Sequence, residues 1–269
     1  NSFEVLNGSS VFLERGVAVQ NGTHSYADNS TLQINANGFL SLDSPTYGTD
    51  SKLIYNSGGN YIRGVEWTGT VDFGYPYEVI IQNGTEVELT NSITTDIGVQ
   101  TDLNIGDATN GAGTLTMTNT PNFLQVEGDV NMGEGASAGN LTLSTVFGGD
   151  IRLRGDWNSI NGSFNPRERA VMFNDSSLQT INNTNAQVQV FDYLIIDNSS
   201  DGVVLDGTFT ELEVRGSAGV PALELLDGDL NLNGKDFFLG RNGNAIGFEI
   251  GNQSVQIFSS MRSSIPHAV

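Results

Sequence analysis

The strongest constraint on the fold is an alternation of apolar and polar residues that recurs in short segments along the chain. Alternation with a period of two is typical of β-strands with one buried face. It is found in segments 31–42, 77–90, 113–119, 139–144, 149–155 and 210–216. No window of about a dozen residues keeps the i, i+3, i+4 apolar spacing of an amphipathic helix. The sequence therefore predicts an all-β fold.

Asn-Gly and Asp-Gly pairs separate these segments and mark tight turns, because both tolerate positive φ. Asn-Gly begins at residues 7, 21, 37, 83, 110, 161, 233 and 242, and Asp-Gly at 201, 206 and 227. Two architectures fit: a right-handed parallel β-helix, or tandem antiparallel β-sandwiches, which the Asn-Gly turns favour somewhat. Strand–turn units of roughly twenty residues, with Asn and Thr abundant at the corners, favour the β-helix. About thirteen coils, stacked about 4.8 Å apart, would make a rod of roughly 60 Å.

The charge of the chain limits its partners. The 269 residues include 31 acidic and 11 basic side chains, for a formal net charge of −20. Such a surface repels phosphate backbones and anionic lipid, so we expect neither nucleic-acid binding nor membrane insertion. No apolar run is long enough to span a bilayer, and the chain has no cysteine for a disulfide or a thiolate metal site.

Residues 227–240, DGDLNLNGKDFFLG, look like a calcium-binding loop. Asp229, Asn231, Asn233 and Gly234 occupy the first, third, fifth and sixth positions of a helix-flanked calcium loop. The twelfth position must supply a bidentate carboxylate, and here it is Gly240. We therefore expect a strand with Leu230 and Leu232 in the core and a turn at Asn233-Gly234. No cofactor is expected, and calcium only as an adventitious ion between acidic turns.

A cluster of basic residues is one candidate interaction site. Arg152, Arg154, Arg167 and Arg169 lie close together in the sequence. They would suit an acidic glycan or a neighbouring subunit, and they are the residues an enzyme acting on acidic polysaccharide would use. The alternative, which we favour, is a solvated face where the arginines pair with Asp150, Asp156 and Glu168.

The two histidines do not favour catalysis. His24 lies in a polar segment, predicted to be an exposed turn, and His267 is near the end of the sequence. The sequence contains no Asp-Asp pair that would suggest the two catalytic carboxylates of a hydrolase. We expect a protein that is not an enzyme.

A second candidate site is rich in aromatic residues. Residues 47–77 hold five of the seven tyrosines together with Trp67. Exposed flat rings stack on sugar faces, so this segment is a candidate glycan-binding site. Its proposed stacking residues are Tyr55, Tyr61, Trp67, Tyr75 and Tyr77. The alternative, which we favour, is that Tyr55, Tyr61 and Trp67 fill a wide coil or cap its end.

The middle of the chain carries an ordered series of short motifs. They are Gly155-Asp156-Trp157, Gly162-Ser163-Phe164, Val171-Met172-Phe173-Asn174, Gln179-Thr180-Ile181 and Phe191-Asp192-Tyr193-Leu194-Ile195-Ile196. In order and spacing this series resembles the large cell-surface and gliding-adhesin repeat proteins of Bacteroidetes, over about a third of the chain. The resemblance implies a β-helical segment of a secreted protein, exported by the type IX route, with no catalytic residues.

Taken together, these features predict a single solenoid segment, residues 1–269, of a longer bacterial extracellular surface protein, with a candidate internal boundary at 146–150. The chain begins without an initiator Met, as a processed or excised piece does. We expect a non-enzymatic stalk or filament whose partners are other copies, adjoining repeats or surface polysaccharide. The alternatives are a glycan-binding module that uses the Tyr-rich segment and, less favoured, a polysaccharide lyase or hydrolase.

Overall fold

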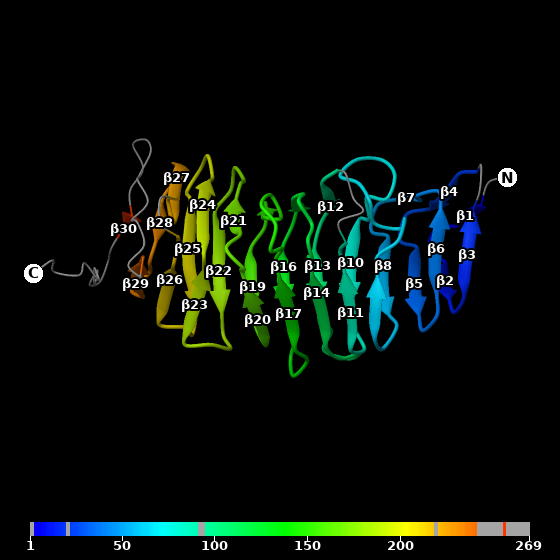
Figure 1. Cartoon of the computed structure of the whole chain (residues 1–269), viewed down its shortest axis with the longest axis horizontal. Helices are drawn as coiled ribbons and strands as arrows, with labels where there is room; N and C mark the ends of the chain where they lie inside the picture. Colours follow the sequence, from blue (N-terminus) through cyan, green and yellow to red (C-terminus); the bar gives the residue numbers. More distant parts are fainter. Residues whose placement is uncertain (1–2, 20–21, 91–94, 218–219, 241–254, 257–269) are drawn as a thin grey trace, which may run out of the picture.

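The computed structural model describes residues 3–19, 22–90, 95–217, 220–240 and 255–256. These residues form a right-handed parallel β-helix of about ten turns (Figure 1). They contain β-strands and no α-helix. All pairs between the named strands are parallel, and antiparallel pairing among the described residues is confined to four isolated bridges. The predicted fold class is confirmed, and the antiparallel sandwich alternative is wrong.

One sheet runs the length of the rod and sets its axis. Its eleven strands, in spatial order, are β2 (Ser10–Leu13), β5 (Thr31–Asn35), β8 (Lys52–Asn56), β10 (Glu78–Ile81), β13 (Leu103–Ile105), β16 (Val130–Met132), β19 (Trp157–Ser159), β22 (Gln179–Asn183), β25 (Val203–Gly207), β28 (Leu230–Asn231) and β30 (Val255–Gln256). Because each turn contributes one strand, consecutive coils are hydrogen-bonded along the axis.

The other faces are built from shorter sheets. A six-stranded sheet contains β12 (Ile97–Val99), β15 (Leu124–Val126), β18 (Ile151–Leu153), β21 (Ala170–Phe173), β24 (Tyr193–Asp197) and β27 (Leu223–Asp227). A five-stranded sheet contains β9 (Asn60–Ile62), β11 (Thr85–Glu88), β14 (Gly113–Thr116), β17 (Gly139–Thr142) and β20 (Gly162–Asn165). Three small sheets pair β1 (Phe3–Val5), β4 (His24–Tyr26) and β7 (Thr46–Tyr47); β23 (Val188–Phe191), β26 (Glu211–Val214) and β29 (Asp236–Leu239); and β3 (Gly16–Val19) with β6 (Phe39–Leu42).

The coils are longer than the sequence predicted. Asn35 lies opposite Asn56, at a separation of 21 residues, whereas Asn104 lies opposite Asn131, at a separation of 27 residues. The predicted coil of roughly twenty residues is therefore too short. The structure has about ten coils instead of the predicted thirteen. At about 4.8 Å per coil the rod is roughly 50 Å long rather than 60 Å. At 146–150 the chain turns from β17 to β18, and the six-stranded sheet continues across this position from β15 to β21.

The Asn-Gly pairs that the structure describes lie at corners between sheets, and only the pair at 110 also closes an antiparallel bridge, between Asp107 and Gly111. Asn83 and Gly84 have φ of 59° and 68°, and they join β10 of the eleven-stranded sheet to β11 of the five-stranded sheet. At 161 the prediction of a positive-φ turn is wrong: neither residue has positive φ, and a Cβ on Gly162 would lie 2.6 Å from the carbonyl oxygen of Gly139. The pairs at 21 and 242 include residues outside those described.

The segment 227–240 folds as the sequence predicts. Leu230 and Leu232 are buried, Asn231 is half-buried, and Asn233-Gly234 has φ of 46° and 80°. Among the described residues no group of three or more His, Cys, Asp or Glu side chains is placed to hold a metal ion. The segment therefore forms two short strands joined by a turn, without the flanking helices of a helix-flanked calcium loop.

Candidate functional site

The Tyr-rich segment lies mostly inside the β-helix. Tyr55 and Trp67 are fully buried, and Tyr61 is 8% exposed. Tyr55 lies 5.2 Å from Tyr61 and 6.3 Å from Trp67, measured between ring centroids. Assigning these three rings to glycan stacking is therefore wrong, because no sugar face can reach them; they fill the coil. Tyr75 and Tyr77 are half-buried at the corner before β10, and burial raises the pKa of Tyr75 to about 12.

The buried rings surround a carboxyl group that was not predicted as part of a site. Glu66 is fully buried, and its Oε1 accepts hydrogen bonds from Tyr55 Oη at 3.1 Å, Tyr61 Oη at 3.2 Å and the backbone N–H of Gly64 at 2.8 Å. Its Oε2 is buried without a hydrogen-bond partner. Arg63 donates to the carbonyl oxygens of Gly64 and Trp67. Burial raises the pKa of Glu66, although its hydrogen bonds and the charge of Arg63 oppose the shift.

His24 is also in a different place from the one predicted. It lies in β4 with 1% of its surface exposed, so the exposed polar turn expected for it is wrong. Both ring nitrogens are buried without a hydrogen-bond partner, and burial lowers the pKa of His24. Since its ring is buried and no hydrogen bond orients it, His24 is a core side chain. His267 lies outside the described residues.

The four arginines of the basic cluster lie around two middle strands of the six-stranded sheet: Arg152 in β18, Arg154 just after it, and Arg167 and Arg169 just before β21. The guanidinium of Arg152 lies 5.1 Å from the ring centroid of Phe123, and that of Arg169 lies 5.7 Å from that of Phe147. Such cation–π contacts are worth about 0.5–1 kcal/mol at exposed sites. Arg167 is exposed in a turn and has φ of 47°.

Ion pairing in this cluster differs from the prediction. Arg154 pairs with Glu127 at 2.8 Å, a partner from the preceding coil. Asp150 and Asp156 use their Oδ1 atoms to accept the backbone N–H groups of Ala170 and Thr180, both at 2.7 Å. The predicted pairing with Asp150, Asp156 and Glu168 is therefore replaced by one intercoil ion pair and carboxylate-to-backbone bonds, with Asp150 close enough to Arg169 to be influenced by its charge.

The most regular polar surface lies on the eleven-stranded sheet. We call it the Asp-x-Asn ladder, and its six residues are Asp102, Asn104, Asp129, Asn131, Asp156 and Asn158. In each of three consecutive coils the residue between Asp and Asn points into the core, so both polar side chains point outward. All six are half-buried.

Each column of the ladder is linked from coil to coil. The amide Nδ2 of Asn104 donates to Glu78 Oε1, that of Asn131 to Asn104 Oδ1, and that of Asn158 to Asn131 Oδ1, each at 2.9 Å. In the other column, Asp102 Oδ1 accepts the N–H of Asp129 at 2.8 Å, and Asp129 Oδ1 accepts the N–H of Asp156 at 2.7 Å. These bonds fix the orientation of every side chain in the ladder.

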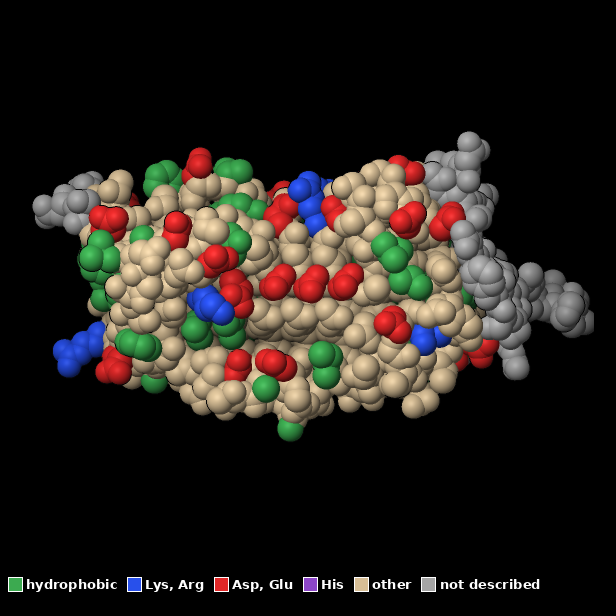
Figure 2. Space-filling model, turned by 180° about the vertical axis from the view of Figure 1, so that it is seen from behind, with side chains coloured by type: hydrophobic (Ala, Val, Ile, Leu, Met, Phe, Trp, Pro, Cys, Tyr) green, Lys and Arg blue, Asp and Glu red, His purple; other side chains and the backbone are tan. Residues whose placement is uncertain are grey.

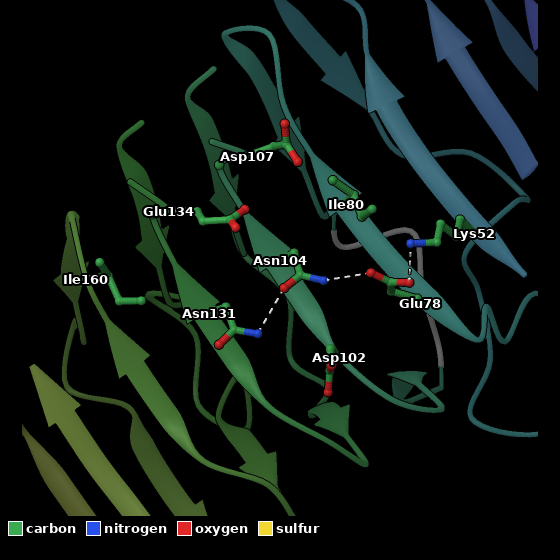
Figure 3. A pocket seen from close by; sticks show the side chains of 11 residues that line it. Lys52, Glu78, Ile80, Asp102, Asn104, Asp107, Asn131, Glu134 and Ile160 are labelled. Atoms are coloured by element: carbon green, nitrogen blue, oxygen red, sulfur yellow. Dashed lines mark hydrogen bonds and ion pairs between the residues drawn. The ribbon is translucent and has the colours of Figure 1, made fainter. Parts of the chain in front are cut away.

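A groove of about 450 Å³ lies over the first two coils of the ladder (Figure 3). This is within the range of ligand sites, about 300–1,000 Å³. The ion pair of Lys52 with Glu78, at 3.0 Å, borders one end, and Ile160 borders the other. Asp107 and Glu134 stand along one side.

The groove is acidic. On the face in Figure 2, acidic side chains form an evenly spaced row along the long axis, as the aspartate column of the ladder requires. Burial raises the pKa of Asp129, and the flanking carboxylates of Asp102 and Asp156 add to the shift. An anionic ligand is therefore disfavoured here.

The ladder was not predicted, although the sequence contains its signal. The tripeptides Asp-Leu-Asn at 102–104, Asp-Val-Asn at 129–131 and Asp-Trp-Asn at 156–158 repeat at an interval of 27 residues. A search for repeats of roughly twenty residues does not align them.

In the part of the chain that the structure describes, no helix is both long and apolar enough to cross a bilayer. Comparisons of the chain with models of protein families, with curated proteins and with solved structures gave no match.

Proposed function

We propose that this chain is a rigid, non-enzymatic stalk segment of a bacterial extracellular surface protein, which holds a binding element at a distance from the cell. The observation that carries the proposal is the eleven-stranded sheet, whose strands pair in parallel from one end of the described rod to the other.

Stiffness follows from the direction of the bonds. In a parallel β-helix the hydrogen bonds between strands run along the rod, and inward side chains of each coil pack on those of the next. Bending the rod must stretch these bonds on one side and compress a close-packed core on the other. The described core is continuous: Leu32, Leu53, Val79, Leu103 and Val130 form one fully buried column in consecutive coils.

One feature of the sequence supports an extracellular location, and a second restricts the partners. The motif series from Gly155 to Ile196 resembles that of gliding adhesins, which are surface proteins. The net charge of −20 also disfavours nucleic acid and anionic lipid as partners.

The rigidity is tested by a distance measurement between spin labels. The chain has no cysteine, so Phe12→Cys and Asp206→Cys would place two labels at exposed positions. The two positions belong to one column, eight strand-to-strand steps apart. At about 4.8 Å per step we expect a narrow distance distribution near roughly 40 Å. A broad distribution would overturn the stalk proposal.

Chains with only one of the two labels are the control. They report distances between molecules, so a dipolar signal from either one would show that copies associate and would identify the end involved. Antibodies against the purified chain, applied to intact cells of the source organism, test the extracellular location separately; failure to stain cells that express the protein would contradict it.

A further inference from the structure

The Asp-x-Asn ladder leaves a defined set of hydrogen-bonding groups unused. A side-chain amide has two N–H donors and an oxygen with two lone pairs, and each ladder Asn uses one donor and one lone pair within its column. Each ladder Asp uses Oδ1 for a backbone N–H, which leaves Oδ2. Each of the three ladder coils therefore presents one amide donor, one amide acceptor and one carboxylate oxygen.

This combination restricts the chemistry of a ligand. An ammonium group only donates, so it would leave the amide N–H groups unpaired. A carboxylate or sulfate only accepts, and it would face the charges of Asp102, Asp129 and Asp156. A hydroxyl group both donates and accepts, so it can pair with both columns.

The spacing of the ladder restricts the ligand further. Equivalent groups recur once per coil, about 4.8 Å apart along the rod. A peptide in extended form repeats its backbone groups about every 3.2–3.4 Å. Its groups would therefore no longer lie opposite those of the ladder after two coils. In an extended β-linked polysaccharide one sugar residue spans nearly the coil spacing. Such a polymer can therefore place one sugar over each coil.

The side chains that would make these contacts are already fixed. The intercoil bonds orient each amide and carboxylate, so little rotamer freedom is left to lose on binding. Ile80, half-buried, and Ile160, 40% exposed, add apolar surface for the C–H faces of a sugar ring.

We propose that the groove over the Asp-x-Asn ladder binds an uncharged, extended polysaccharide that lies along the rod, one sugar residue to each coil. This assigns a lateral binding site to the chain, and it does not depend on the proposed role as a stalk. It also moves the expected polysaccharide contact from the Tyr-rich segment, which is largely buried, to the eleven-stranded sheet.

Titration calorimetry of the whole chain tests the proposal. The uncharged, extended polymers are glucomannan and xyloglucan, and the comparison ligands are glucose, polygalacturonate and chitosan oligomers. We expect at least one uncharged polymer to bind while glucose does not, because only a polymer spans several coils. Asn131→Ala interrupts the amide column and should weaken that binding about tenfold, the effect of losing roughly one hydrogen bond.

Asn140→Ala is the matched control, since Asn140 lies in a polar column of the five-stranded sheet, where it bonds to Thr114 and Ser163. It should leave the affinity unchanged. A second variant, Ile160→Arg, places a long charged side chain at the border of the groove without altering the ladder or the core, and should weaken binding at least as much. Binding of only charged polymers, binding of none, or equal losses in Asn131→Ala and Asn140→Ala would each overturn the proposal.

Discussion

Two parts of the β-helix interior hold large aromatic side chains, and they differ in what lies between the rings. Around β19, Trp157 packs edge-on against Phe164 at 4.7 Å and Phe191 at 5.5 Å between centroids. In the earlier coils, Tyr55, Tyr61 and Trp67 surround the carboxyl group of Glu66.

The two clusters both fill the interior of a coil, but with side chains of different polarity. The rings of the Trp157 cluster pack on one another, and the indole N–H of Trp157 is buried without a hydrogen-bond partner. The second cluster instead encloses a titratable carboxyl group, which is closed off from solvent. Burial and the charge of Glu66 raise the pKa of Tyr55 and Tyr61, so these phenols remain neutral donors. Buried aromatic residues in a solenoid can therefore either fill the core or hold a polar group within it.

The largest effect is expected at the Trp157 cluster. Trp157→Ala removes a fully buried ring and leaves a cavity, which should lower the free energy of unfolding by about 3–5 kcal/mol. Urea denaturation measures the loss. Because the contacting rings do not titrate, the loss should be the same at pH 5 and pH 8 to within roughly 0.5 kcal/mol. A loss that changes strongly with pH would mean that the two clusters do not differ as described.

The second effect concerns Glu66 and should depend on pH. Its pKa is raised by burial, so the folded state binds the proton more tightly than the unfolded state. The stabilisation from this proton is present below the unfolded-state pKa and is lost as pH rises toward the folded-state value. Glu66→Gln keeps the neutral shape, and we therefore expect the variant to gain stability relative to the natural chain as pH rises above about 4.5.

By neutral pH the gain should reach about 1–3 kcal/mol, the usual cost of a buried polar group with incomplete bonding. The measurement is urea denaturation of both chains across the pH range. Glu86→Gln, at an exposed position of β11, is the control and should show no such trend. A constant difference between the natural chain and Glu66→Gln would show that Glu66 titrates alike in both states.

A smaller effect is expected when one phenol is removed from the carboxyl group. Tyr55→Phe deletes the hydroxyl that donates to Glu66 and keeps the ring, so stability should fall by about 1 kcal/mol. In the Glu66→Gln background the same substitution should have a different cost, since the two groups are in contact. A double-mutant cycle in urea measures this coupling. Strict additivity would argue against the hydrogen bond.

The smallest effect is expected for an exposed charge. Lys52 pairs with Glu78 at 3.0 Å, and its side chain is 45% exposed. Lys52→Gln should lower stability by about 0–1 kcal/mol, and the effect should vanish at about 1 M salt, where screening acts within roughly 3 Å. The pH-dependent effect at Glu66 should persist in that salt because the site is buried. Thermal unfolding at two salt concentrations compares them.

Much of the fold follows from patterns in the sequence, and much of the site does not. Alternation predicts the strands and the inward side of Leu230 and Leu232, because a strand in a β-helix has one buried face. The Asn-Gly pairs indicate corners but not pairing direction, since a left-handed Asn-Gly corner serves parallel coils as well as hairpins. The length of a coil was underestimated because corners vary while strands stay short.

The interior positions of polar residues were the least predictable. Glu66 and His24 are buried although they occur in segments without regular alternation. The phenols that bond to Glu66 come from β8 and β9, earlier in the same coil, and the sequence does not show that they turn toward it. The Asp-x-Asn ladder was predictable in principle, because its interval of 27 residues is visible in the sequence.

That interval has a consequence for how such a chain can change in length. A coil of 27 residues is a unit that returns the backbone to the same point one step along the axis. Duplicating one such unit within the gene would lengthen the rod by about 4.8 Å and add one more Asp-Asn rung in phase with the others. After an insertion of any other size, the extra residues must form a longer corner. Otherwise the Asp and Asn side chains of the later coils no longer align with the ladder. The length of the rod can therefore change in whole coils while the spacing of the ladder stays constant.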